Sequence, residues 1–310
     1  MYNIKWKYLL AMLLLLPTTL SAQERQTYPF VERDSTLRLD VWHPATQRTD
    51  RACVVALFGG GFVVGQRDNE YQCQVAAELT SRGFVVVSPD YRLGLKDSVK
   101  VASFGRSPKG LQQMFQWTID LATEDCASAV AWVVAHADEL GIDPQRIVLT
   151  GCSAGAITVA QLDYCRANGL PQASALPQGW KPAAVVPYAG AVMCKGAPRY
   201  ATAPAPTLFM HGKKDKIVVY KRFPPLLRHA LYGPKTLFKV FKKGGYPVWL
   251  VTFDGIGHEV SAFLPGSTDL FCGFVNQVFS GRITTLEASM NDKKLVPTEW
   301  TNMNVFELYK

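Results

Sequence analysis

Short, continuous apolar runs, separated by helical patterns and loops, constrain the fold of this chain more than any other feature. Runs of this kind are typical of strands that are buried on both faces of a sheet. Fully apolar runs occupy residues 52–58, 84–87 and 183–186, and mostly apolar runs that we also predict to be buried strands occupy residues 146–150, 207–210 and 249–253. Helical patterns occupy residues 70–82, 120–140 and 153–168. Repeated strand, crossover and strand units predict a mostly parallel central sheet with helices on both faces.

The remaining stretches are less regular. Residues 36–42 alternate apolar and polar side chains, as an antiparallel edge strand does. Residues 94–119 show no clear periodicity and contain Gly105, Pro108 and Gly110, which indicates a long loop or a partial cap. Hydrophobic residues make up 48% of the 310 and charged residues only 19%, so the chain is globular and long enough for one large α/β domain.

The first residues have the pattern of a secretion signal. Lys5 and Lys7 form a basic start, residues 8–16 form an apolar run too short to span a bilayer comfortably, and small residues follow up to Ala22. A retained N-terminal anchor is the alternative interpretation. We expect cleavage before Gln23 and export to the periplasm or the extracellular space, without stable membrane insertion afterwards. The chain then divides into a signal peptide at residues 1–22, a main domain at 23–280 and a C-terminal extension of unassigned structure at 281–310.

Charge and cysteine usage narrow the range of partners. The net charge is +8, and cleavage after Ala22 removes two lysines and no acidic residue, which leaves +6. Such a surplus can attract acidic polymers, but we favour a role in solubility because no nucleic-acid motif accompanies it. The seven cysteines match no zinc spacing, and their odd number leaves at least one thiol free in a monomer. We therefore expect no nucleic-acid partner and no metal, and the disulfide pairing and oligomeric state stay open.

Residues 149–158, LTGCSAGAIT, contain the pattern G-x-S-x-G around Ser153. The pattern alone is weak because Gly, Ser and Ala are common. Its context is stronger, since Ser153 follows an apolar strand, begins a helix and has the small neighbours Gly151, Ala154 and Gly155 that so tight a turn needs. The start of the helix also places positive potential beside an oxygen anion. These features predict that Ser153 is a nucleophile.

A serine hydroxyl needs a base to become reactive. His258 comes directly after the last apolar strand and among glycines, so its loop can bring the imidazole over the sheet. The other histidines lie where packing or a surface position is more typical, and these are His43, His136, His211 and His229, the last in a polar segment that we expect to be helical. Asp215, after the strand at 207–210, is the favoured partner that orients the imidazole. Asp254 is the competitor, but it precedes His258 so closely that little chain is left for a loop reaching back to Ser153.

A glycine run at residues 59–61 follows another of the apolar strands. Glycines let the backbone approach a ligand closely and point its amides at an oxygen anion. Such a run is most often a plain turn. Combined with Ser153, an oxyanion hole made by the backbone amides of Gly60, Gly61 and Ala154 is the better interpretation.

Several segments between about residues 50 and 262 resemble α/β-hydrolases of the carboxylesterase and hormone-sensitive-lipase type. They are LFGGGFVVG, VVSPDYRLG, EDCASAVAWVVAHADELGIDPQRIVLTGCSAGA, HGKKDKIV and GIGHEV. The resemblance implies the α/β-hydrolase fold for a catalytic domain at 23–280, an esterase activity, no cofactor, and a triad of Ser153, Asp215 and His258. Phe58 stands where the family often has a histidine before the glycines. That histidine usually has a supporting role, so we expect the glycine amides to serve without it.

The expected export also resembles that of bacterial polysaccharide-associated esterases, which remove acetyl or feruloyl groups from plant glycans. A small-molecule or glycan ester is therefore the expected substrate, bound in a pocket shaped by residues 94–119 and 216–248. The alternatives are an amide-cleaving hydrolase on the same fold and a catalytically silent secreted binding protein.

Two neighbours of the site have a structural interpretation. Arg92 is expected to form a buried ion pair with Asp125 or Glu124. Cys152 is expected to serve packing, because a thiol there has no second base.

Overall fold

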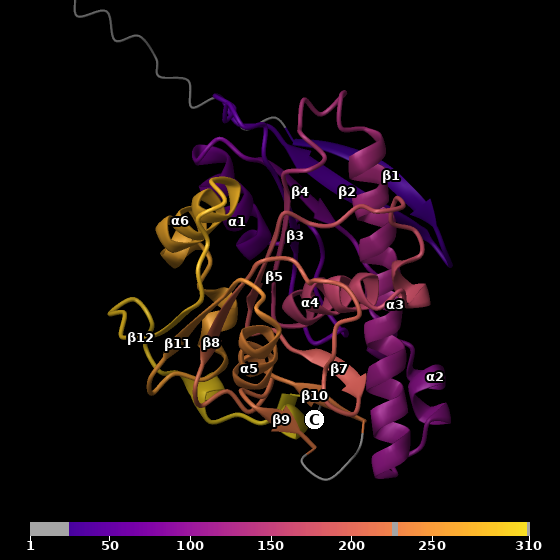
Figure 1. Cartoon of the computed structure of the whole chain (residues 1–310). Coiled ribbons are helices and arrows are strands. Elements are labelled where there is room, and N and C mark those ends of the chain that lie inside the picture. The colour runs from indigo at the N-terminus through magenta and orange to yellow at the C-terminus, as the bar shows by residue number, and fades with distance from the viewer. Residues whose placement is uncertain (1–24, 225–228, 309–310) are drawn as a thin grey trace, which may run out of the picture.

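A sheet of nine strands forms the centre of the molecule in the computed structural model, which describes residues 25–224 and 229–308 (Figure 1). The strands are, in spatial order, β1 (Arg25–Glu32), β2 (Thr36–Trp42), β4 (Val85–Pro89), β3 (Cys53–Leu57), β5 (Ile147–Cys152), β6 (Ala184–Tyr188), β8 (Thr207–Gly212), β11 (Val248–Phe253) and β12 (Leu286–Met290). All neighbours from β4 to β12 are parallel, whereas β2 is antiparallel to β1 and β4. The expected mostly parallel sheet is confirmed, and the expected signal peptide at residues 1–22 lies outside the described residues.

Helices cover both faces of this sheet. They are α1 (Glu70–Ser81), α2 (Ser98–Ser103), α3 (Pro108–Ala135), α4 (Ala154–Ala167), α5 (Pro234–Gly244), α6 (Thr268–Phe279) and α7 (Val305–Leu308). On β3, Cys53, Val55 and Leu57 join an apolar core with α3 and α4, while Val54 and Ala56 join a core with α1 and α6 on the opposite face. Because alternate side chains are buried on opposite faces, the central strands are mostly apolar, which explains the apolar runs in the sequence.

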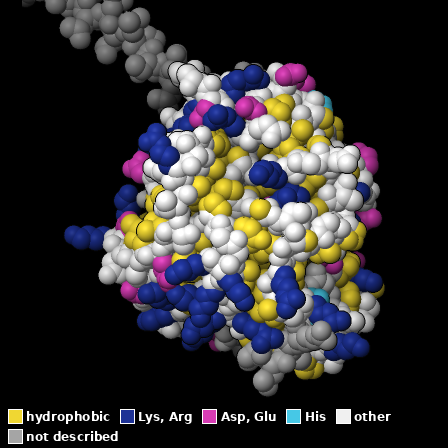
Figure 2. All heavy atoms as spheres, viewed as in Figure 1, with side chains coloured by type: hydrophobic (Ala, Val, Ile, Leu, Met, Phe, Trp, Pro, Cys, Tyr) yellow, Lys and Arg dark blue, Asp and Glu magenta, His cyan; other side chains and the backbone are white. Residues whose placement is uncertain are grey.

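A small antiparallel sheet lies beside α5 at one end of the molecule. Its strands are β7 (Val192–Lys195), β10 (His229–Tyr232) and β9 (Arg222–Phe223). Helix α5 buries its apolar side against this region and exposes Lys239, Lys242 and Lys243. Lys and Arg side chains gather over this part of the surface (Figure 2). The lysine-rich segment is thus a solvated surface, and no helix in the described ranges is long and apolar enough to cross a bilayer.

Four expectations about secondary structure were wrong. β2 is not an edge strand, because β1 pairs along its outer side. Residues 94–119 are not a loop, because α2 and the start of α3 occupy most of them. The side chain of Ser107 caps α3 before Pro108, and the helix ends at Ala135 rather than at residue 140. His229 lies in a strand, β10, and not in a helical segment.

The C-terminal residues extend the sheet and then return to the segment that carries His258. β12 pairs in parallel with β11. A short 3-10 helix, Glu299–Thr301, then brings the chain against another 3-10 helix, His258–Ala262. Residues 281–310, which had no assignment from sequence, therefore contribute both to the sheet and to the surroundings of His258.

Candidate active site

Ser153 lies on a sharp turn between β5 and α4. β5 ends at Cys152 and α4 begins at Ala154, so the serine alone links strand and helix. Its backbone has φ 52° and ψ −114°, a strained conformation for a residue with a side chain. The start of α4 packs so closely on the sheet that a Cβ at Gly155 would lie 2.4 Å from the carbonyl oxygen of Phe58. Close packing of helix on sheet therefore requires a glycine at this place in the G-x-S-x-G pattern.

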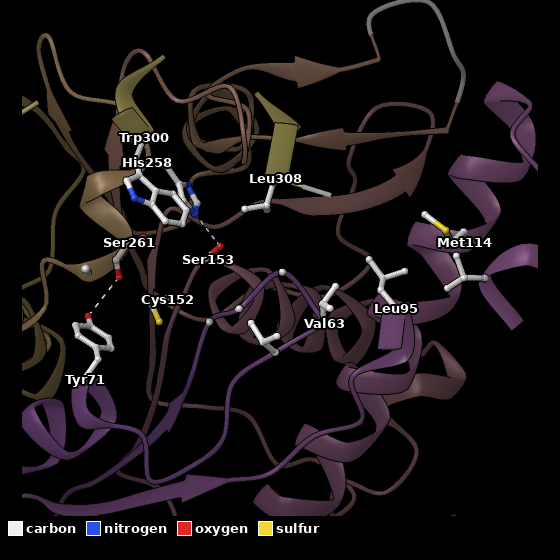
Figure 3. A pocket seen from close by; sticks show the side chains of 16 residues that line it. Val63, Tyr71, Leu95, Met114, Cys152, Ser153, His258, Ser261, Trp300 and Leu308 are labelled. Atoms are coloured by element: carbon white, nitrogen blue, oxygen red, sulfur yellow. Dashed lines mark hydrogen bonds between the residues drawn. The ribbon is translucent and has the colours of Figure 1, made fainter. Parts of the chain in front are cut away.

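The structure brings Ser153, His258 and Asp215 into one chain of hydrogen bonds. The hydroxyl of Ser153 donates to Nε2 of His258 at 2.8 Å (Figure 3), and Nδ1 of His258 donates to Oδ2 of Asp215 at 2.8 Å. The other carboxylate oxygen of Asp215 accepts from the backbone amides of Ile217 and Val218, each at 2.9 Å. Asp215 and His258 are only 5% and 2% exposed. The carboxylate is thus fixed by the backbone on one side and orients the imidazole on the other.

The other candidates lie apart from this chain of hydrogen bonds. The carboxylate of Asp254 contacts Lys213 at 2.7 Å and Ser289 at 2.8 Å. His136 stacks on the ring of Trp132. The structure therefore joins His258 to Asp215 and not to its competitor.

His211, for which packing was the expected role, lies directly beside Asp215. Its Nε2 donates to the carbonyl of Val218 at 2.8 Å and lies 3.4 Å from Oδ2 of Asp215. Burial lowers the pKa of His211, and the opposing charge of Asp215 does not restore it. The ring is therefore neutral at neutral pH and adds a second imidazole beside the carboxylate.

The glycine run at residues 59–61 passes directly beside the serine. A Cβ added at Gly59 would lie 3.3 Å from the Cβ of Ser153. Gly60 and Gly61 have φ 121° and 62°, which only glycine adopts without strain. The sequence-predicted donors Gly60 and Gly61 thus border the serine turn, and Ala154 is the first residue of α4 beyond it.

An aromatic contact supports the residue before the glycine run, and an ion pair lies next to this contact in the chain. Phe58 stacks on Tyr91 with ring centroids 4.3 Å apart, and the Tyr91 hydroxyl donates to the Phe58 carbonyl at 2.7 Å. Phe58 thus supports the loop where the resembled family often has a histidine. The expected ion pair is present, because Arg92 contacts Asp125 at 2.8 Å and Glu124 at 3.0 Å, and Asp125 is fully buried.

Cys152 packs beside the serine as an unreactive thiol. Its side chain is buried, and burial raises the pKa of the Cys152 thiol to about 12. A thiol with this pKa is protonated at neutral pH and is a poor nucleophile. In the part of the chain that the structure describes, no group of three or more His, Cys, Asp and Glu side chains is placed to hold a metal ion.

A cavity of about 620 Å³ opens at Ser153, with two unlike walls that face each other across the serine. The partly polar wall consists of Tyr71, Ser261 and Trp300, and the apolar wall of Val63, Leu95 and Met114 (Figure 3). Residues 94–119 therefore shape the pocket as expected. The described part of residues 216–248 does not line this cavity, and several of its members line a separate apolar cavity of about 320 Å³ instead.

Trp300 was missed by sequence reasoning. Its ring stacks on the imidazole of His258, with centroids 5.9 Å apart and planes 25° apart, and the residue is 39% exposed. The signal in the sequence was weak, a tryptophan among polar residues in TEWTN. Its place at the site depends on how the C-terminal segment folds back, which no local pattern indicates.

Among the solved structures that this chain resembles is esterase 2 of Thermogutta terrifontis. The two share a TM-score of 0.57 at 21% sequence identity, over 84% of this chain and 96% of that one. The chain has the α/β-hydrolase fold. In this fold a nucleophile occupies the strand-to-helix turn, and the triad partners follow it in the chain in the order found here for Asp215 and His258.

The family model matches the part of the chain that contains the expected nucleophile but not its two partners. The model of the carboxylesterase family matches residues 16–169, which include the glycine run and Ser153 and end before Asp215 and His258. Lipase 2 of Moraxella sp. (strain TA144) is 34% identical over 113 residues, 36% of this chain and 21% of the lipase. Esterase LipC of Mycobacterium tuberculosis is 31% identical over 142 residues, 46% of this chain and 30% of the esterase.

The chain spans only 21% and 30% of the length of these two curated relatives. The structural likeness supports the α/β-hydrolase fold, and the family match and the esterases among the relatives bear on the function that is proposed next.

Proposed function

We propose that this protein is a secreted serine carboxylic-ester hydrolase that works through an acyl-enzyme. The observation that carries the proposal is the chain of hydrogen bonds from Asp215 through His258 to Ser153, with 2.8 Å at each step, beside a cavity of about 620 Å³. An imidazole held by a buried carboxylate and facing a serine hydroxyl has the geometry of a general base beside a nucleophile. The carboxylesterase match supports esters as the substrate class.

The proton path follows from this geometry. Ser153 Oγ attacks the carbonyl carbon of the ester while its proton moves to Nε2 of His258, and Asp215 stabilises the imidazolium. The bond to the leaving alcohol then breaks, and the alcohol takes the proton from His258. The acyl group stays on Ser153. A water molecule attacks this acyl-enzyme, gives a proton to His258, and the acid leaves as the serine is restored.

The negative oxygen formed in each attack needs hydrogen-bond donors. The backbone amides of Gly60, Gly61 and Ala154 are the proposed donors, because the glycine run borders the serine turn and Ala154 opens α4. The start of α4 adds the positive end of the helix dipole. Loss of one such donor typically raises the barrier by about 3 kcal/mol.

The cavity divides the substrate into two halves. His258 gives its proton to the leaving alcohol, so the alcohol lies on the side of His258 and the acyl group extends toward the opposite wall. That wall is apolar and suits an uncharged acyl group, of which acetyl and feruloyl are examples. We propose an ester of a small molecule or a glycan, and export to the periplasm or the extracellular space on the pattern of residues 1–22.

Labelling with a fluorophosphonate tests the enzyme class. The wild-type protein should be labelled at Ser153, and Ser153→Ala should lose the label together with at least about a thousandfold in kcat on acyl esters. Equal labelling of both proteins would place the reactive nucleophile elsewhere and contradict the proposal, and no labelling of the wild type would contradict it in favour of a silent binding protein. A matched panel of acyl esters and peptide amides then distinguishes an esterase from an amide-cleaving hydrolase, and faster cleavage of the amides would overturn the ester assignment.

A further inference from the structure

We propose that Trp300 and the segment around it form a binding subsite for the alcohol half of the substrate, and that this subsite fits a sugar ring. The segment, residues 294–304, is named the C-terminal strap. The inference rests on the proposed function, because an alcohol half exists only if the substrate is an ester. It specifies where the leaving alcohol binds and to which chemical class that alcohol belongs.

The C-terminal strap is fastened to the loop that carries His258. Oε1 of Glu259 accepts from the backbone amide of Thr298 at 2.8 Å, from its hydroxyl at 2.8 Å, and from the hydroxyl of Thr301. Oε2 of Glu259 accepts from the amide of Gly257 at 2.8 Å. The contact is so close that a Cβ at Gly257 would lie 2.6 Å from Cα of Thr301. The strap therefore holds Trp300 in a fixed place beside His258.

The position of Trp300 assigns it to the alcohol side. The group that leaves must lie next to His258, since it receives the proton from that imidazole. The indole of Trp300 stacks on the same imidazole at a centroid distance of 5.9 Å. Trp300 is still 39% exposed and lines the cavity, so part of its surface stays open to a ligand (Figure 3). A leaving alcohol larger than a few atoms must meet this ring.

A second hollow continues from the cavity past Trp300. It measures about 590 Å³ and shares four lining residues with the catalytic cavity, His258, Ser261, Ala262 and Trp300. Beyond them it is lined by Lys294, Val296 and Thr298 of the strap, among others. A substrate whose ester carbonyl lies at Ser153 can therefore extend its alcohol half past Trp300 into this hollow without leaving the protein surface.

The lining chemistry favours a polyhydroxylated ring. The indole face and Val296, which is 63% exposed, offer apolar surface, and Ser261, Thr298 and Lys294 place polar groups around it. Contiguous apolar surface that is rimmed by polar groups is typical of binding sites. A sugar ring has apolar C–H faces that stack on an indole and hydroxyls at its edge that meet polar groups and water. A long alkyl alcohol would instead need an enclosed apolar channel.

Two substrates with the same acyl group test this subsite, ethyl acetate and an acetylated xylo-oligosaccharide. The measured quantity is the ratio of kcat/KM for the glycan ester to kcat/KM for ethyl acetate. Any disturbance of His258 by a change at Trp300 affects both substrates and cancels in the ratio. Trp300→Ala should lower the ratio by about tenfold or more, and Trp300→Phe, which keeps a flat ring, should recover part of it. Leu95→Ala on the apolar wall is the matched control and should leave the ratio within about twofold.

An equal loss on both substrates in Trp300→Ala would show that Trp300 only positions His258, and it would overturn the subsite. Binding of the unacetylated xylo-oligosaccharide to Ser153→Ala, followed by tryptophan fluorescence, gives an independent readout. The oligosaccharide should change the fluorescence of Ser153→Ala and not of Ser153→Ala/Trp300→Ala. Hydrolysis of ethyl acetate without glycan hydrolysis or binding would refute the subsite and leave the proposed function standing. Glycan binding at Trp300 with no ester hydrolysis would refute the proposed function, and with it the assignment of this sugar site to an alcohol half.

Discussion

Asp215→Asn probes the chain of hydrogen bonds with almost no change in shape. The asparagine oxygen can still accept from the backbone amides of Ile217 and Val218, which now hold Oδ1 at 2.9 Å. The side-chain amide nitrogen then faces Nδ1 of His258 and Nε2 of His211, which Oδ2 faces now at 2.8 Å and 3.4 Å. An amide nitrogen cannot accept from Nδ1–H. The imidazole of His258 must therefore carry its proton on the other nitrogen.

The wrong tautomer directs an N–H at the serine, so His258 can no longer accept the serine proton. A change of this kind in a serine triad lowers kcat by about ten-thousandfold, which corresponds to about 5 kcal/mol in the activation barrier. We expect a loss of this size in Asp215→Asn with a melting temperature within a few degrees of the wild type. The assay is kcat on a soluble acyl ester together with the rate of fluorophosphonate labelling.

Asp254→Asn is the matched control, because Asp254 was the competing carboxylate and its ion pair with Lys213 lies on the surface. Its activity should stay within about twofold of the wild type. The reasoning would be refuted if Asp215→Asn kept more than about a tenth of the activity, or if Asp254→Asn lost as much as Asp215→Asn.

Three further changes test the surroundings of the site. Gly155→Ala places a Cβ 2.4 Å from a backbone oxygen, so α4 must shift. We expect kcat to fall by about a hundredfold and the melting temperature to drop. Unchanged kinetics would show that the turn tolerates the shift. Burial raises the pKa of Cys152 to about 12, so iodoacetamide at pH 8 should leave the native enzyme active, and rapid inactivation traced to Cys152 by peptide mapping would contradict this. Burial raises the pKa of Glu259, but hydrogen bonds from Thr301 and Thr298 outweigh this and hold it below its ordinary 4.5. The stability that Glu259 provides is therefore complete above about pH 4.5 and is lost as the pH falls through its folded pKa, so the melting temperatures of wild type and Glu259→Gln should converge at low pH; a constant difference down to pH 3 would contradict this.

Much of the fold could be predicted because strands that are buried on both faces of a sheet appear in the sequence as short apolar runs. The run at 52–58 is apolar throughout and the run at 207–210 is apolar after Thr207, and both are central strands. The nucleophile turn was recognisable for a related reason. The close approach of α4 to the sheet admits only small residues around Ser153, and these residues are neighbours of Ser153 in the sequence.

The edge strands and the segments near the active site have no such clear sequence pattern. β1 and β12 lie at the edges of the sheet and have no fully buried side chain, so neither shows the pattern of a strand buried on both faces. The first part of α3 borders two cavities and is only partly buried, which blurs its helical period. Trp300 reaches His258 only because the chain returns after β12, a consequence of tertiary structure that spacing in the sequence does not show.

The central claim is that His258 makes the hydroxyl of Ser153 nucleophilic and that the acyl group passes through that oxygen. Mass spectrometry of a reaction with an activated acetyl ester, quenched in acid within the first turnovers, tests it directly. The account predicts an acetyl group on the peptide that contains Ser153, and none on Ser153→Ala or His258→Ala treated in the same way. Rapid hydrolysis of the ester with no acetylated serine, or an acetyl group that forms equally in His258→Ala, would contradict it.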